Sequence, residues 1–198
     1  MVASAAAVNH EAPPQEVVDK FVALCHGRLD LVQSMLKEHP ALINMRSKDD
    51  ETGIQAACHT GQKEIVKFLL SQGAVLDICV ASLLGMEDDV RGRLDADAAQ
   101  IDVKGAHGLP VMLYAALGGN LPIARLLFER GAVVDGGDGI ATPLHGAVWS
   151  NAPEIAELLL ANGARTDAKD FMGKTPRESA EAAKREQVLQ VFARHGAA

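Results

Sequence analysis

The stretch Thr142-Pro143-Leu144-His145-Gly146-Ala147 decides how the rest of the chain is interpreted. Thr142 can cap a helix and Pro143 suits its first turn, and apolar residues follow at helical spacing. About ten residues later Pro153 begins a second apolar helical segment, which ends at Asn162-Gly163. Two helices this short cannot bury their apolar faces against each other alone. The stretch therefore predicts a helix pair that packs against neighbours of the same kind.

Two regular spacings along the chain predict those neighbours. A residue between paired helices recurs at intervals of 34, 24, 34, 32 and 33 residues, at Gly27, Gly61, Gly85, Gly119, Asn151 and Lys184. A Gly-Ala dipeptide recurs as well, at Gly73-Ala74, Gly131-Ala132, Gly163-Ala164 and Gly196-Ala197. Agreement between two such spacings indicates tandem repeats more strongly than any single motif.

The T-P-L-H sequence at Thr142–His145, with a period near 33 residues, resembles the ankyrin-repeat family. The resemblance implies an all-α solenoid of about six helix pairs over residues 15–198, forming a single domain. It also implies a structural hydrogen-bonding role for His145 in its turn. We expect residues 1–14 to be a flexible tail, and the polar last repeat to close the stack.

The third repeat departs from the pattern. After Gly73-Ala74 the chain runs almost directly into the apolar segment 78–85, without the ten or so residues that elsewhere form a projecting β-turn, or finger, and the start of the helix. We expect a shortened third repeat that lacks its finger. This would leave a notch floored by Leu83 and Leu84. The departure has two alternative explanations: sequence drift without a function, or a notch kept because it binds a ligand.

The resemblance implies binding through the projecting turns and the exposed residues of each first helix. Trp149 is a candidate anchor, because Trp is over-represented among residues that dominate binding energy, although it could instead only pack on the next repeat. The predicted function is recognition of a protein or peptide partner, as a scaffold, through the concave groove. The predicted partner-binding residues are Glu51, His59, Leu83, Leu84, His107, Leu109, Leu117, Ile140, Trp149 and Phe171.

A second hypothesis places a small-molecule or catalytic site in the notch, where Glu51, His59 and His107 would converge over an apolar floor. The dipeptides Cys25-His26 and Cys58-His59 suggest a metal site, but the repeat register places Cys58 in a core position. We therefore predict no metal site and no cofactor. We assign no catalytic residue, since no catalytic motif is present, and the chain is better explained as a binding module than as an enzyme.

Composition narrows the possible partners. The formal net charge is −7, and no run of Lys or Arg is longer than two adjacent residues. Neither nucleic acid nor an anionic membrane is therefore an expected partner. Three cysteines without a C-x-x-C motif suit a reducing compartment. The longest uncharged apolar run, residues 78–86, is too short to cross a membrane, and the first 14 residues do not resemble a signal peptide. We expect a cytoplasmic protein.

Overall fold

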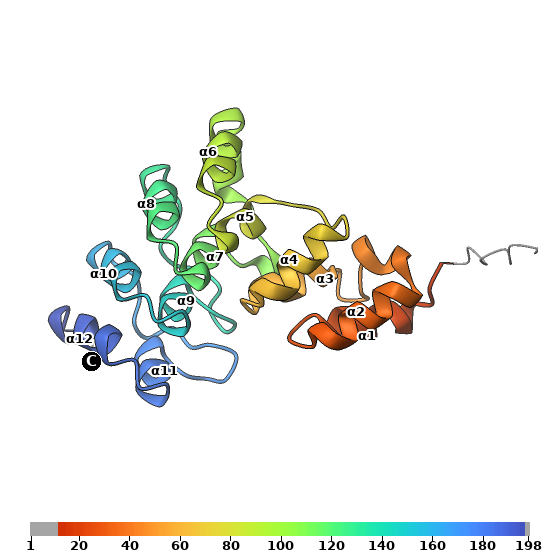
Figure 1. Cartoon of the computed structure of the whole chain (residues 1–198). Coiled ribbons are helices and arrows are strands. Elements are labelled where there is room, and N and C mark those ends of the chain that lie inside the picture. The colour runs from red at the N-terminus through yellow and green to blue at the C-terminus, as the bar shows by residue number, and fades with distance from the viewer. Residues whose placement is uncertain (1–11, 197–198) are drawn as a thin grey trace, which may run out of the picture.

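The computed structural model describes residues 12–196 (Figure 1). The predicted tail, residues 1–14, lies almost entirely outside this range. Twelve α-helices follow one another along the described chain: α1 (Gln15–Leu24), α2 (Leu29–Glu38), α3 (Gly53–His59), α4 (Lys63–Ser71), α5 (Ile78–Leu84), α6 (Glu87–Ala96), α7 (Val111–Gly118), α8 (Leu121–Glu129), α9 (Pro143–Trp149), α10 (Pro153–Ala161), α11 (Pro176–Ala182) and α12 (Glu186–Arg194). Three 3-10 helices, η1 (Pro40–Asn44), η2 (Ala98–Asp102) and η3 (Ala106–Gly108), lie between them.

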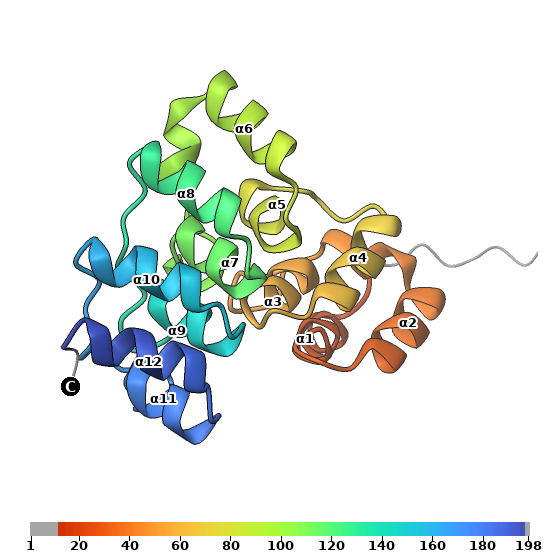
Figure 2. The same cartoon turned by 60° about the vertical axis from the view of Figure 1, so that its left-hand side comes forward.

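The helices pack as six antiparallel pairs, α1 with α2 through to α11 with α12, and the first helix of each pair contacts the first helix of the next. Figure 2 shows α6, α8, α10 and α12 forming an outer row beside the inner row α5, α7, α9 and α11. Within residues 12–196 there is no β-strand, only two isolated bridges, Arg46↔Thr52 and Lys104↔Pro110, which close two fingers. The predicted all-α solenoid is confirmed.

Threonine caps begin three of the inner helices. The side chains of Thr52, Thr142 and Thr175 each accept a hydrogen bond from the backbone N–H three residues later. In return, the side chain at that later position accepts a hydrogen bond from the backbone N–H of the cap residue. In α9 the returning side chain is His145, whose Nδ1 accepts from the Thr142 N–H at 3.2 Å. Each such cap satisfies backbone donors that a short helix would otherwise leave unpaired.

From the second repeat onward, the regular spacing read from the sequence corresponds to a left-handed backbone residue after the first helix of each pair, whereas Gly27 in the first repeat is not left-handed. Gly61, Gly85, Gly119, Asn151 and Lys184 all have φ between 53° and 78°. Such a residue turns the chain out of the first helix and into the second, and glycine takes this conformation without the steric cost that a Cβ brings.

Side chains from one repeat cap the helix ends of the repeat before it. The Asn120 amide donates to the carbonyl oxygens of Ser82 and Leu83 at the end of α5, at 2.7 and 3.1 Å. Ser150 Oγ donates in the same way to the Ala116 carbonyl of α7, at 2.7 Å. These bonds supply partners for carbonyl groups that have none within their own helix, so the repeats are joined by polar contacts as well as by the core.

The third repeat lacks its finger, as predicted, because α4 ends at Ser71 and only six residues separate it from α5. The expected notch, however, is not open. The finger of the fourth repeat fills it: α3 contacts both η3 and α7, and Lys63 Nζ donates to the Gly118 carbonyl at 2.7 Å. The second and fourth repeats therefore meet directly on the inner face.

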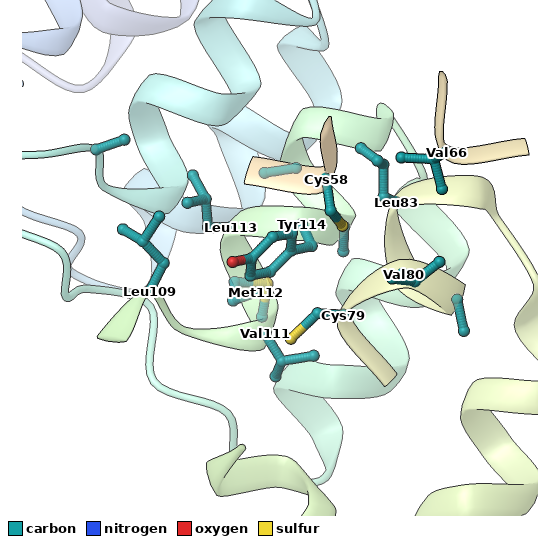
Figure 3. Close-up of a cluster of buried hydrophobic side chains, with 14 of the residues drawn as sticks. Cys58, Val66, Cys79, Val80, Leu83, Leu109, Val111, Met112, Leu113 and Tyr114 are labelled. Atoms are coloured by element: carbon teal, nitrogen blue, oxygen red, sulfur yellow. The ribbon is translucent and has the colours of Figure 1, made fainter. Parts of the chain in front are cut away.

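Leu83 does not form the floor of a surface notch. It is fully buried, and Figure 3 shows it in the core near Val66 and Val80. The third repeat is one residue shorter between the helix cap and the turn: the left-handed Gly85 comes eight residues after the cap Asp77 of α5, whereas Gly61 comes nine residues after the cap Thr52 of α3. When the repeats are aligned on this glycine, Leu83 is therefore matched with His59, which is one position away from its true equivalent. Leu84 occupies the position equivalent to His59 and is partly buried.

No helix within residues 12–196 combines the length and the apolar character needed to cross a lipid bilayer.

Candidate functional site: a cavity on the inner face

A cavity of about 600 Å³ opens on the inner face of the stack. One wall comes from the N-terminal repeats, the floor from the fourth repeat, and the opposite wall from α9 and the loops before α9 and α11. The lining residues are His26, His59, Thr60, His107, Leu109, Leu117, Ile140, Ala141, Trp149, Phe171 and Met172. A cavity of this size, lined mainly by apolar side chains with a few polar groups, has the character of a binding site.

Seven of the ten sequence-predicted site residues line this cavity: His59, His107, Leu109, Leu117, Ile140, Trp149 and Phe171. Three do not. Leu83 lies in the core, Leu84 is partly buried and packs against the core, and Glu51 is buried against His59. Leu109 is itself only 1% exposed, so its contribution is to the cavity floor.

The wall nearer the C-terminus is aromatic. The rings of Trp149 and Phe171 meet edge to face with centroids 6.4 Å apart, and Trp149 also contacts the His145 ring at 5.7 Å. The Phe171 N–H donates to the Ile140 carbonyl at 3.0 Å, which ties the two loops together. Trp149 thus packs on its neighbours and lines the cavity at the same time.

Two large apolar side chains at the cavity rim are exposed. Phe171 is 68% exposed and Met172 is 57% exposed, although both belong to a loop held by hydrogen bonds to the Asp170 carboxylate. Apolar side chains of this size gathered at the mouth of an apolar cavity mark an interaction surface more clearly than scattered exposed residues do.

The opposite wall is formed by three histidines in a row. The rings of His26 and His59 lie 5.1 Å apart and those of His59 and His107 lie 5.0 Å apart, both edge to face. His59 is the last residue of α3, and His26 lies two residues beyond the end of α1. His107 reaches them from the fourth-repeat finger, where it has the left-handed φ of 56°. Because the third repeat has no finger, nothing separates His107 from the second repeat.

Glu51 lies against this row and is only 6% exposed. Its Oε1 is 2.9 Å from His59 Nδ1 and 3.8 Å from His107 Nε2. Burial raises the pKa of Glu51, but contact with His59 and the positive charge that His59, His107 and His26 can carry outweigh burial, so that the pKa lies below its ordinary value. The carboxylate is therefore ionised beside the three imidazoles.

The sequence analysis did not select four residues that line the cavity: His26, Thr60, Ala141 and Met172. His26 directly precedes Gly27 as Thr60 precedes Gly61, and Met172 follows the predicted Phe171, so both could have been found from the repeat register. The adjacent Cys25 is fully buried, and burial, followed by the charge of Glu51, raises the pKa of its thiol to about 12. Cys58 and Cys79 are buried too, with pKa values raised chiefly by burial.

Comparison with known proteins agrees with this architecture. The family model for ankyrin repeats (3 copies) matches residues 20–132 and 77–170. A putative ankyrin repeat protein of Rickettsia felis is 28% identical over 159 residues, which is 75% of this chain and 59% of that protein. A transient receptor potential cation channel subfamily A member 1 homolog of Caenorhabditis elegans is 25% identical over 164 residues, which is 78% of this chain and 13% of that protein.

The chain thus spans less than two thirds of the length of these relatives. The family match nevertheless covers most of the described residues, and the capped helix pairs, left-handed turns and fingers repeat along the same segment. The chain belongs to the ankyrin-repeat family.

Proposed function

We propose that this protein binds a protein or peptide partner on the inner face of the stack, and that an apolar side chain of the partner enters the cavity. Ankyrin repeats are generally protein-interaction modules. The single observation that carries the proposal is the cavity itself, with exposed Phe171 and Met172 at its mouth and Trp149 in its wall.

The aromatic wall would supply most of the affinity. A buried aromatic anchor surrounded by contacts that exclude water is the usual source of binding energy in a protein interface. Trp149 is already held in place by His145 and Phe171, so that little side-chain freedom is lost on binding. Leu117 and Ile140 extend the apolar surface next to it. The histidine row would contribute selectivity through polar contacts.

Affinity capture from the cell of origin, followed by quantitative mass spectrometry, tests the proposal. The variant Phe171→Ser removes an exposed apolar side chain from the cavity mouth and should not disturb the core. The matched control is Val75→Ser, which removes an equally exposed apolar side chain (63%) outside the cavity. We expect Phe171→Ser to reduce recovery of the partner by about tenfold, the effect of losing roughly 1.4 kcal/mol of binding energy. Equal recovery with wild type, Phe171→Ser and Val75→Ser would refute the proposed surface.

A second candidate function follows from the size of the cavity. A volume of about 600 Å³ falls in the range of roughly 300–1,000 Å³ that small-molecule pockets occupy. The protein would then bind an apolar small molecule between the histidine row and Trp149. Native mass spectrometry of the purified protein, compared with the variant Leu117→Trp that fills the cavity, distinguishes the two functions. A bound mass that the variant loses supports the small-molecule function, and its absence in both samples favours the macromolecular partner.

A further inference from the structure

We propose that His26, Glu51 and His59 form a binding site for a divalent transition-metal ion such as Zn²⁺, with His107 as a further ligand. One ligand atom from each of His26, Glu51 and His59 lies within 4.8 Å of the other two. The proposal concerns a site beside the cavity and does not depend on the partner.

The distances suit a small ion. A tetrahedral zinc ion with bonds of about 2.1 Å holds its ligand atoms roughly 3.4 Å apart. Glu51 Oε1 is 3.8 Å from His107 Nε2, and His59, whose Nδ1–H donates to the Gln55 carbonyl, keeps the lone pair of its Nε2 for the ion. His26 is an exposed side chain just beyond the end of α1 and lines the cavity, so an ion can reach its ring.

The ring of His26 is held in the form that binds metal. Its Nδ1 lies 3.2 Å from the carbonyl oxygens of both Val22 and Ala23. A carbonyl can only accept, so Nδ1 carries the proton, and the neutral ring keeps a lone pair on Nε2. Metal-binding histidines in proteins are commonly oriented in this way, by donating their other N–H to a backbone carbonyl.

One oxygen of the Glu51 carboxylate lacks a hydrogen-bond donor among the described residues. This oxygen, Oε1, is also inaccessible to solvent. The nearest candidate, the Nδ1–H of His59, is directed at the Gln55 carbonyl 3.1 Å away. A buried charged oxygen without a donor is costly, and a cation bound among these side chains would remove that cost.

Glu51 is also an exception to the repeat pattern. The residue directly before the helix cap is apolar in the third, fourth and fifth repeats (Leu76, Leu109 and Ala141) and is the half-buried Lys174 in the sixth, whereas Glu51 is a buried carboxylate. A carboxylate in this interior position is unfavourable for packing alone. The residues opposite it are three histidines on three different segments, which a packing role does not require.

The donor set selects the class of ion. Imidazole nitrogens combined with one carboxylate suit Zn²⁺ and the other late first-row divalent ions. Ca²⁺ and Mg²⁺ need mainly oxygen ligands, and the cluster has only one carboxylate. All three histidines line the cavity, so that an ion can enter from it.

Isothermal titration of the full chain with ZnCl₂, after treatment with a chelator, tests the proposal. We expect one Zn²⁺ per chain, and at least about tenfold weaker binding in both His26→Ala and Glu51→Gln. His26→Ala changes an exposed side chain and keeps the fold, which guards against a failure of Glu51→Gln to fold. The control is His195→Ala, because His195 Nε2 makes a separate contact with Glu157 at 2.6 Å near the C-terminus.

A second readout is thermal unfolding with Zn²⁺ or with EDTA. Zn²⁺ should raise the melting temperature of wild type and of His195→Ala, but not of His26→Ala. Binding that persists in both cluster variants, or that is lost in His195→Ala, would overturn the proposal, as would the absence of any heat of binding to wild type.

Discussion

His145 joins two repeats through both nitrogens of its ring. Its Nδ1 accepts from the cap residue Thr142, so the proton is on Nε2, which donates to the Lys174 carbonyl in the following loop at 3.0 Å. The ring is fully buried and uses both of its hydrogen-bonding atoms as a neutral imidazole. A second proton would place a positive charge in the core and would occupy the nitrogen that accepts from Thr142.

This arrangement predicts a loss of stability in mild acid. Burial is the largest influence and lowers the pKa of His145 below its ordinary 6.5, although the Lys174 carbonyl, Asp170 and Asp138 oppose it. As the pH falls below 6.5 the unfolded chain takes up a proton that the folded chain refuses. The stability that neutral His145 provides is therefore complete above pH 6.5 and is lost as the pH falls from there toward the lower folded pKa.

The variant His145→Gln should flatten that dependence. Gln55 occupies the equivalent position in α3, where its Oε1 accepts from the Thr52 N–H at 3.0 Å. Glutamine can therefore keep the capping box without titrating. We expect the variant to be less stable than wild type by about 1 kcal/mol at pH 8, because it loses the bond to Lys174, and to lose less stability on acidification. Urea denaturation at pH 8 and pH 5.5 measures both quantities, with His39→Gln at an exposed position as the control. Parallel pH profiles for wild type and His145→Gln would contradict this role.

The local backbone structure at single positions was the feature most easily predicted from the sequence. The T-P-L-H stretch predicted the capped helix, and the recurring glycines matched positions with a left-handed backbone. The side chains of Glu51 and His107 could be placed near each other only through the repeat register. Their actual contact depends on how the fourth-repeat finger lies across the second repeat, which no local pattern encodes.

At the scale of the element, the inner helices α5 and α7 approach each other closely. A Cβ added to Gly118, at the end of α7, would lie 2.5 Å from the Leu83 carbonyl oxygen and 2.2 Å from the Asn120 amide nitrogen. Asn120 cannot move away without giving up its two bonds to α5. This glycine is therefore required by close packing.

The variant Gly118→Ala should be less stable than wild type by about 1–3 kcal/mol, the usual cost of forcing extra volume into a packed contact. Equilibrium denaturation followed by circular dichroism gives the free energy of unfolding directly. A change of less than about 0.5 kcal/mol, which is the effect of an ordinary surface substitution, would mean that the two helices can separate freely.

Replacement of Gly92 in α6 by alanine should stabilise the protein, in contrast to the replacement of Gly118. Gly92 is helical and exposed, and a Cβ added to it would meet nothing within 4 Å. The variant Gly92→Ala should be more stable by roughly 0.5–1 kcal/mol, because alanine loses less conformational entropy in a helix. The same denaturation experiment serves as the measurement. A loss of stability in this variant would show that α6 needs the freedom of a glycine.

The length of an element was harder to predict than its presence. The sequence predicted the short third repeat, but not that the cap of α5 lies one residue closer to its left-handed glycine than the caps of α3 and α7 do. Since the side chains of a helix change face with every residue, that single deletion moves Leu83 from the expected surface into the core. When the repeats are aligned on the cap residue instead, which is Asp77 in α5, Leu84 and not Leu83 is the equivalent of His59.

At the scale of the whole molecule, the missing third finger determines the shape of the inner face. The second and fourth repeats meet where a finger would otherwise stand, and this contact completes the histidine row on one side of the cavity. The aromatic wall comes from α9 and from the loop before α11, in the fifth and sixth repeats (helices in Figure 1). Residues from five repeats therefore surround one cavity, so its binding properties depend on the intact stack.

Trp149 is the only tryptophan of the chain and lies in the cavity wall, which makes it an internal reporter of the proposed site. The most direct test of partner binding at the cavity is a titration of its fluorescence with the partner recovered by affinity capture, or with a peptide from it that lacks tryptophan. We predict a saturable blue shift, since the partner replaces water beside the indole, and a weaker response in Phe171→Ser. Binding demonstrated by calorimetry under the same conditions, with the emission of Trp149 unchanged, would contradict the proposal that the cavity is the partner site.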